Sequence, residues 1–483
     1  MNILMILYLL GFILLLTAAF MILPMIVALF FSEKAGLAFL VTAAVCAVLG
    51  ILLRLKKPKN TKFYAREGFV TVALSWIVIS LAGAVPFRIT GEIPNYLDAV
   101  FETVSGITTT GASILTAVEP MSKCLLFWRC FTNWLGGMGV LVFMLTILPG
   151  DSHNTIHLLK AESPGPSVSK IVPKMKESTA ILYGMYVALG LIQLIFYLFG
   201  DIPVFDAICL TLATSGTGGF AVLNDSFGSY SMYIQGVTTV FMMLFGINFT
   251  LYFFMLRKEF RYIKENSELR WYFAIMAFAI VSITLSLVLS DRHYFDTVFE
   301  AFHHSAFAVL TCMSTCGFAT ADFDKWPEFA KIILVSVMFV GGCAGSTGGG
   351  LKVSRIAILI KSAIAEVRHE LRPREVQNVV MDGKKLPQEI VKGVCLYFIL
   401  YATLFALSIM LVALDNFDFT TTVTSVIATI NNIGPGLGMV GPTGNFSQFS
   451  AFSKIILTLD MLFGRLELLP MMMLFMPGTW KKN

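Results

Sequence analysis

The sequence predicts an all-α polytopic membrane protein, and its composition and hydropathy both point there. Of its 483 residues 57% are hydrophobic and only 13% are charged, whereas soluble globular proteins carry about 25% charged residues. A helix that crosses the hydrocarbon core needs about 20 mostly apolar residues. Such runs recur along the whole chain, at 3–31, 36–53, 68–89, 124–148, 179–199, 232–256, 271–290, 329–358, 388–414 and 452–477.

The charges predict how these runs cross the membrane. Most Lys and Arg residues lie in clusters at 54–66, 160–176, 257–270, 352–392 and 481–482, and the segments between the clusters are rich in Asp and Glu. Basic loops stay in the cytoplasm, and one basic cluster follows each pair of runs. We therefore expect five helical hairpins that open outward, with both termini in the cytoplasm. The N-terminal run is too long for a cleaved signal peptide and is expected to be retained.

The outer ends of the last four hairpins contain a repeat. Four segments align on one glycine, at 98–111, 206–219, 304–317 and 421–434, and each has about ten residues of helical character before a small polar tetrad. The tetrads are TTTG, GTGG, STCG and NNIG. A helix this short cannot span, so we expect four re-entrant segments, each a pore helix followed by an extended stretch. Irregular backbone at membrane depth is tolerated where it lines a cavity or is buried in protein. The alternative is that these are ordinary outer loops, with Gly and Thr forming turns.

The resulting fold prediction is four tandem helix–pore-helix–filter–helix repeats with pseudo-fourfold symmetry, plus an N-terminal helix pair. Four extended stretches that face one another could replace the hydration shell of a cation with carbonyl oxygens. Glycine permits the positive φ that turns a carbonyl inward, and the helix C-termini favour positive charge. The expected divisions are 1–66 for the N-terminal hairpin and 67–176, 177–265, 266–386 and 387–483 for the four repeats.

These repeats resemble the Trk/Ktr/HKT superfamily of potassium-uptake proteins. The N-terminal pair, the tetrads, "TNWLGGMGV" at 132–140 and "GRLELLPMMMLF" at 464–475 are similar to the TrkH/TrkG membrane subunits of the bacterial Trk system. The resemblance implies that backbone carbonyls of each filter coordinate K⁺ as the transported ion. The implied filter residues are Thr109, Thr110, Gly111, Thr217, Gly218, Gly219, Thr315, Cys316, Gly317, Asn432, Ile433 and Gly434.

A glycine-rich stretch interrupts the run at 329–358. Six glycines between 340 and 350 each cost a helix about 1 kcal/mol relative to alanine, so a continuous helix there is improbable. The alternative is close helix packing through small residues. The resemblance implies an intramembrane gate loop, formed by Gly342, Cys343, Ala344, Gly345, Ser346, Thr347, Gly348 and Gly349. The basic stretch 352–374 would connect this loop to the cytoplasm.

Arg465 lies inside the last apolar run. A charge near mid-bilayer is costly and is by default a functional residue. Beneath a cation filter it would be an electrostatic barrier, which the resemblance also implies. Two alternatives remain: an ion pair with Glu467 or Asp460, although both are poorly spaced for one, or a structural role in which Arg465 caps backbone carbonyls.

The predicted function is K⁺ uptake across the bacterial inner membrane, with no organic cofactor. The alternative is a secondary symporter coupled to H⁺ or Na⁺ with alternating access. A membrane enzyme would need convergent titratable groups within the spans, and few are present. No nucleotide or metal motif appears, no nucleic-acid partner is expected, and the eight scattered cysteines predict no disulfide framework. The resemblance implies a homodimer and a cytoplasmic nucleotide-binding subunit of the TrkA type, for which 352–392 is the candidate docking surface.

Overall fold

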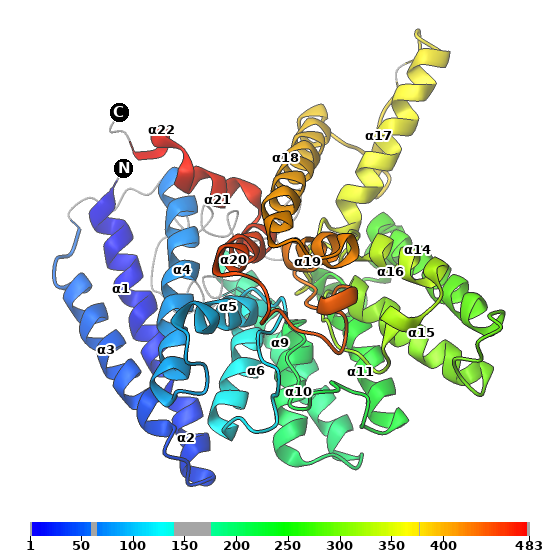
Figure 1. The fold of residues 1–483 in the computed structure, drawn as a ribbon. Helices are drawn as coiled ribbons and strands as arrows, with labels where there is room; N and C mark the ends of the chain where they lie inside the picture. The colour runs from blue at the N-terminus through cyan, green and yellow to red at the C-terminus, as the bar shows by residue number, and fades with distance from the viewer. Residues whose placement is uncertain (1, 59–64, 140–174, 376, 481–483) are drawn as a thin grey trace.

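The computed structural model describes residues 2–58, 65–139, 175–375 and 377–480, and nearly all of its secondary structure is helical (Figure 1). Six described helices are long and apolar enough to cross a membrane, and a bent helix pair makes a seventh candidate. The predicted all-helical multi-pass fold is confirmed at this level. The second half of the run at 124–148 and the basic cluster at 160–176 lie almost entirely outside the described residues.

The N-terminal helices pack side by side at the edge of the molecule, in blue in Figure 1. They are α1 (Ile3–Phe20), α2 (Ile22–Phe30) and α3 (Gly36–Arg54). A Cβ added to Gly11 would lie 2.8 Å from the carbonyl oxygen of Gly50, so these two glycines let the backbones approach closely. At the turn before α3, the carboxylate of Glu33 accepts hydrogen bonds from the backbone amides of Lys123 (2.7 Å) and Cys124 (3.0 Å). Glu33 thereby caps the first turn of the helix that starts at Lys123.

Four short helices lie between longer ones, at the places where the sequence predicts pore helices. They are α5 (Tyr96–Ile107), α10 (Val204–Gly216), α15 (Val298–Met313) and α19 (Phe419–Ile430). The helices that precede them are α4 (Ala65–Thr90), α9 (Met175–Leu198), α14 (Ser267–Val288) and α18 (Gln388–Val412), and those that follow are α6 (Lys123–Gly137), α11 (Met232–Phe245), α16 (Glu328–Met338) and α20 (Ala451–Leu466). Side-chain caps start three of the short helices, from Asn95, Thr297 and Asp418.

In the last three hairpins the second long helix is broken. The predicted run at 232–256 is not one straight helix, because α11 and α12 (Phe249–Leu256) meet at 91°. Asn248 accounts for the bend: its side chain accepts a hydrogen bond from the amide of Thr250 and starts a new helix. The predicted break in 329–358 is present, between α16 and α17 (Val353–Leu371). The last run is also interrupted, at Glu467 with a φ of 64°, where α20 gives way to α21 (Leu468–Phe475).

Small elements complete the described chain. Strands β1 (Val380–Met381) and β2 (Lys384–Lys385) form an antiparallel hairpin that was not predicted from the sequence. Its turn residues Asp382 and Gly383 both have positive φ, as a two-residue type I′ turn requires. The remaining elements are α13 (Phe260–Glu265), α22 (Pro477–Trp480) and the 3₁₀ turns η1 (Phe323–Lys325), η2 (Ala413–Asp415) and η3 (Gly438–Val440).

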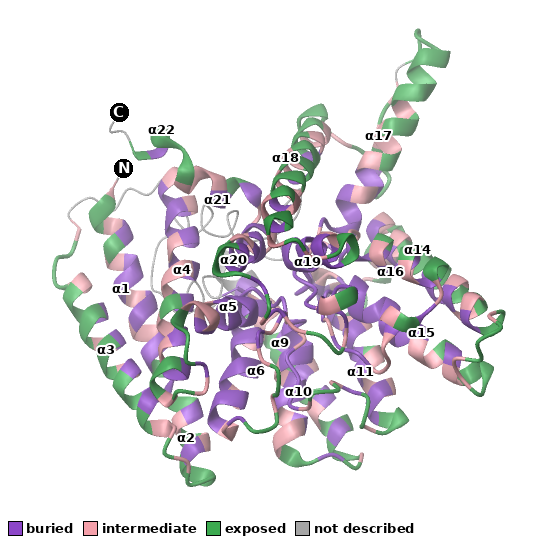
Figure 2. Cartoon of the chain, in the orientation of Figure 1, coloured by how far each residue is buried: buried purple, intermediate pink, exposed green. Residues whose placement is uncertain are grey.

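Burial separates an interior from a lipid-facing surface. Figure 2 shows α5 and the neighbouring part of α19 largely buried, whereas α3 and the far end of α17 are largely exposed. Large apolar side chains are exposed on the long helices, as with Leu37 (65%) of α3 and Phe278 (69%) of α14. Such exposure would be unfavourable in water and is expected against lipid. The short helices and the segments after them therefore form the centre of the molecule.

Candidate functional site: a ring of four filter segments

All four short helices end with the same backbone motif. The residue two positions before the shared glycine has positive φ in every copy: Thr109 (56°), Thr217 (53°), Thr315 (59°) and Asn432 (54°). The following amide donates to the carbonyl five residues back, from Thr110 to Ser105, Gly218 to Ala213, Cys316 to Thr311 and Ile433 to Ala428. This is a Schellman ending. Three of its left-handed residues are β-branched threonines, which rarely adopt that conformation, and such strain is typical of functional sites.

The four glycines then close a ring. Gly111, Gly219, Gly317 and Gly434 have φ values of 81°, 76°, 83° and 96°. A Cβ on any of them would lie less than 3.0 Å from the carbonyl oxygen of the penultimate residue in the next segment. The pairs are Gly111 with Gly218, Gly219 with Cys316, Gly317 with Ile433, and Gly434 with Thr110. Glycine is therefore required twice at each position, for its φ and for the space it leaves to its neighbour.

The hydroxyls of the filter threonines are mostly engaged elsewhere. Thr110 Oγ1 lies 2.8 Å from Thr108 Oγ1 and accepts from Asn432 Nδ2 at 2.9 Å. Thr217 Oγ1 donates to the carbonyl of Gly216 (2.7 Å). Carbonyl oxygens are thus the polar atoms that these segments have available in common.

A cavity of about 140 Å³ adjoins the ring, on the side that the predicted topology places outside, and is called the outer cavity below. Its lining includes all four glycines, together with hydroxyl and amide side chains of the neighbouring loops.

The carboxylate of Asp418 lies at the start of α19. It accepts hydrogen bonds from the side chain and the backbone of Thr421, and these hold the pKa of that carboxyl below its usual value. A carboxylate at a helix N-terminus stabilises the helix.

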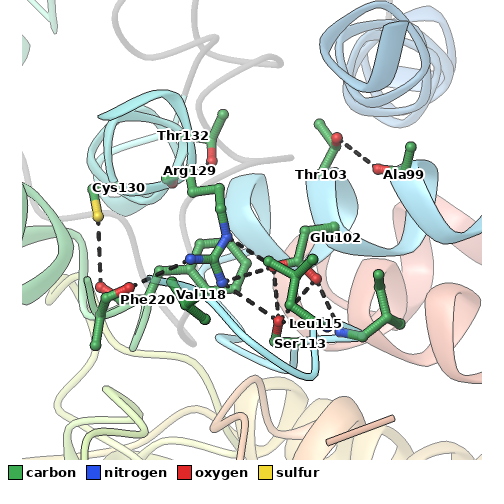
Figure 3. A network of polar contacts seen from close by, with 12 residues as sticks. Ala99, Glu102, Thr103, Ser113, Leu115, Val118, Arg129, Cys130, Thr132 and Phe220 are labelled. Atoms are coloured by element: carbon green, nitrogen blue, oxygen red, sulfur yellow. Dashed lines mark hydrogen bonds and ion pairs between the residues drawn. The ribbon is translucent and has the colours of Figure 1, made fainter. Parts of the chain in front are cut away.

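A buried ion pair borders the outer cavity (Figure 3). Arg129 of α6 contacts Glu102 of α5 at 2.8 Å, with both side chains at most 2% exposed. Glu102 also accepts from Ser113 Oγ (2.9 Å) and from the amide of Ile114 (3.0 Å), just after the first filter. On its other side, the guanidinium lies 4.1 Å from the ring centroid of Phe220, just after the second filter. The pair therefore links the chain segments that directly follow the first and second filters.

The predicted gate loop lies against the opposite end of the filter segments. The amide of Gly349 donates to Thr315 Oγ1 (2.6 Å). A Cβ on Gly348 would lie 2.9 Å from the carbonyl oxygen of Ser314, and one on Gly349 would lie 2.8 Å from that of Asn431. The loop thus approaches segments three and four so closely that only glycine fits.

The loop is tied to the break between α11 and α12. The amide of Cys343 donates to the carbonyl of Gly246 (2.9 Å), and that of Phe249 donates to the carbonyl of Gly345 (3.1 Å). Glu268, near the start of α14, accepts from the amides of Ala344 (2.7 Å) and Ser354 (3.1 Å) and so holds both ends of the loop. Within the predicted set, Ala344 is half-buried and Gly345 is exposed, while the other members are buried.

The basic side chain of Arg465 also contacts the loop. Arg465 donates to the carbonyls of Thr347 and Gly137, each at 2.7 Å, and to that of Gly136. The structure therefore supports the carbonyl-capping alternative for Arg465 and also its contact with the loop. Glu467 contacts Arg355 of α17 at 2.6 Å, and Asp460 accepts from Ser408 Oγ at 2.7 Å.

Sequence reasoning missed several of these residues. Lys352, 1% exposed, donates from Nζ to the carbonyl of Gly348, yet in the sequence it only begins a basic stretch. Glu268, Arg355 and Arg129 find partners far along the chain, so no local pattern identifies them. The break at Gly246–Asn248 had one local signal, an Asn that caps a helix inside an apolar run.

Comparisons with known proteins agree with this geometry. A model of the TrkH family, described as a cation transport protein, matches residues 35–482. The Trk system potassium uptake protein TrkH of Salmonella typhimurium is 35% identical over 478 residues, covering 98% of each chain. TrkG of Escherichia coli is 33% identical, covering 98% of this chain and 97% of that protein. The crystal structure of the potassium transporter TrkH from Vibrio parahaemolyticus superposes with a TM-score of 0.89 at 31% identity, covering both chains completely. The predicted resemblance and the prediction of a transporter rather than an enzyme are both confirmed: the chain belongs to the TrkH family of cation transport proteins.

Proposed function

We propose that this protein takes up K⁺ across the bacterial inner membrane through the ring formed by its four filter segments. The observation that carries the proposal is the closed cycle of contacts, in which each filter glycine leaves room for the penultimate carbonyl of the next segment. The uptake function named for the relatives supports the choice of ion.

The carbonyls of the twelve predicted filter residues coordinate the ion in this proposal. Carbonyl oxygens held in a ring replace the water that a cation loses on entry. Four helix C-termini point the negative ends of their dipoles at the same place. The four tandem repeats surround the pore with pseudo-fourfold symmetry, but only the last filter residue is the same in all of them.

The loop 342–349 is the gate, and Arg465 is the electrostatic barrier beside it. In support, the loop lies against the inner ends of two filter segments, and Arg465 bonds the loop at Thr347. Ion passage requires the loop to move away, which breaks its hydrogen bonds to α12, α14 and Arg465.

The proposal extends to the topology and assembly of the whole protein. The chain consists of the N-terminal pair, 1–66, and four pore repeats, 67–176, 177–265, 266–386 and 387–483, with both termini in the cytoplasm. Both described ends lie close together at the upper left of Figure 1, which is consistent with this topology. Two copies form a homodimer, and a cytoplasmic nucleotide-binding subunit docks on 352–392 and moves the gate.

Ion flux into liposomes tests this proposal. Purified protein should pass K⁺ down its gradient and discriminate against Na⁺. Gly111→Ser or Gly434→Ser should reduce the K⁺/Na⁺ permeability ratio, because the added side chain would displace the carbonyl of Gly218 or Thr110, respectively. Gly236→Ser is the matched control, since a Cβ at this helical position meets nothing within 4 Å.

Two results would count against the proposal. Unchanged selectivity in both filter variants would remove the ring from the mechanism. Uptake that strictly requires an H⁺ or Na⁺ gradient, with no passive K⁺ flux, would favour the alternative of a coupled symporter. The four re-entrant segments share one orientation in the chain, which favours a pore over the inverted repeats common in symporters.

A further inference from the structure

The second filter segment differs from the other three at its penultimate position. Thr110, Cys316 and Ile433 carry side chains there, but Gly218 does not. Thr110 accepts from Asn432 of the neighbouring repeat, Cys316 Sγ lies 3.9 Å from the carbonyl oxygen of Thr214, and Ile433 is fully buried. In these three segments the penultimate side chain is packed into the protein. Gly218 has no side chain with which to do this.

Asn133 of α6 occupies the space beside Gly218. A Cβ added to Gly218 would lie 2.5 Å from both Cβ and Nδ2 of Asn133 and still closer to its Cγ. The backbone carbonyl of Asn133 likewise lies against Gly216, at the end of the same pore helix. The amide of Asn133 therefore replaces, from outside the segment, the missing penultimate side chain.

The side-chain amide of Asn133 is buried without hydrogen-bond partners among the described residues. Asn133 is fully buried, and within the described part of the chain neither its Oδ1 nor its Nδ2 has a hydrogen-bond partner. A buried amide can form up to four hydrogen bonds, and leaving both of its polar atoms unpaired is costly. Such a group in a native structure calls for an explanation. The corresponding residue of α20 is Met461, which is fully buried and apolar. It lies three residues before Gly464, the glycine of α20 that contacts the pore helix of its own repeat.

We propose that Asn133 is a positioning residue for ion selectivity. Its amide supports the peptide of Gly218 and holds that carbonyl in the ring, where it faces Gly111. Because Nδ2 and Oδ1 have no hydrogen-bond partner among the described residues, the amide acts on Gly218 through this close packing. This inference rests on the proposed K⁺ pathway and adds a residue outside the filter itself.

The test compares K⁺ and Na⁺ permeability in liposomes that contain full-length protein. Asn133→Ala is expected to lower the K⁺/Na⁺ ratio about fivefold, because the peptide of Gly218 loses the packing that holds its carbonyl in the ring, while ion flux persists. Thr132→Ala is the matched control: Thr132 is the adjacent residue of α6, its Oγ1 donates to the carbonyl of Arg129, and it packs on Gly106 rather than on a filter residue. This control should keep the wild-type ratio. Asn133→Ser replaces the alanine variant if the latter does not fold.

A compensating pair separates positioning from general damage to the fold. Asn133→Gly removes all three atoms that a Cβ on Gly218 would strike. The double variant Asn133→Gly with Gly218→Ala should therefore recover selectivity relative to Asn133→Gly alone. An unchanged permeability ratio in Asn133→Ala, or no recovery in the double variant, would overturn the inference. Absence of K⁺-selective flux in the wild-type protein would instead overturn the proposed function, so the two failures are distinguishable.

Discussion

Glu102 and Arg129 place opposite charges in the buried wall of the outer cavity. Taking a charge out of water costs several kcal/mol unless a partner and hydrogen bonds compensate. Here the carboxylate has four donors, from Arg129, Ser113 and Ile114, so the compensation is close to complete. The arrangement also leaves no net charge at the cavity wall, which matters where a cation is to pass.

Glu102→Gln should destabilise the protein strongly. It leaves the buried guanidinium of Arg129 unpaired, which costs about 3–5 kcal/mol. The expected result is a lower thermal unfolding midpoint in detergent, together with slower cation flux because a positive charge remains beside the cavity.

Glu328→Gln is the control for this prediction. Its carboxylate pairs with Lys331 but is 81% exposed, and exposed pairs contribute about 0–1 kcal/mol. Equal midpoint shifts in the two variants would mean that burial of the first pair has no energetic consequence.

At the level of elements, three separate segments converge on the proposed gate loop. Glu268 of α14 accepts two of its amides, the break between α11 and α12 exchanges two backbone hydrogen bonds with it, and Arg465 of α20 bonds its Thr347 carbonyl. The preceding residue on α14, Ser267, donates its backbone amide to Asp382 in the turn of the β-hairpin (2.6 Å). The hairpin and the loop therefore contact adjacent residues of one helix terminus.

Glu268→Ala should weaken the closed position of the proposed gate loop. It removes the acceptor for the amides of Ala344 and Ser354, so the closed position loses hydrogen bonds that each contribute about 1 kcal/mol or more. In liposomes without any partner protein, basal K⁺ flux should rise several-fold.

Glu265→Ala provides the comparison, because Glu265 is an exposed residue close by that pairs only with Arg261 among the described residues. It should leave basal flux at the wild-type level. A basal flux in Glu268→Ala no higher than in this control would show that the carboxylate does not hold the loop.

At the level of the whole molecule, the ring joins segments more than 300 residues apart. Asn432 Nδ2 donates to Thr110 Oγ1 across 322 positions of the chain. A cation held by all four segments would stabilise the entire fold, because a ligand that binds only the native state shifts unfolding by mass action.

Replacing K⁺ with Na⁺ at constant ionic strength should therefore lower the unfolding midpoint of the purified protein. Gly434→Ser should abolish the difference, because it disturbs the site that distinguishes the ions, whereas Gly236→Ser should retain it. An equal midpoint in both salts for the wild-type protein would contradict selective binding by the ring.

The sequence was sufficient for features that depend on local patterns. Hydropathy predicted the spans. The glycines at 111, 219, 317 and 434 located the re-entrant segments, because a positive φ and a close approach between backbones both favour glycine. The glycines at 341–350 likewise predicted the break after α16.

Features that depend on distant partners could not be predicted in this way. Arg355 and Glu467 pair across 112 positions, and no local sequence pattern near either residue predicts the other. The bend at Gly246–Asn248 lies in a run whose hydropathy alone predicts a straight span. The hairpin at 380–385 was missed despite its Asp-Gly pair, which is a recognised turn signal.

The contacts around the ring run in one rotational sense. Each glycine makes room for its successor, from segment one to two, two to three, three to four, and four back to one. Damage at one quarter should therefore be felt first by the following quarter rather than by the preceding one. In a genetic selection for restored growth on limiting K⁺, suppressors of Gly111→Ser should accumulate near Gly218, and suppressors of Gly317→Ser near Ile433. The order of the repeats along the gene would then be readable from the positions of the revertants.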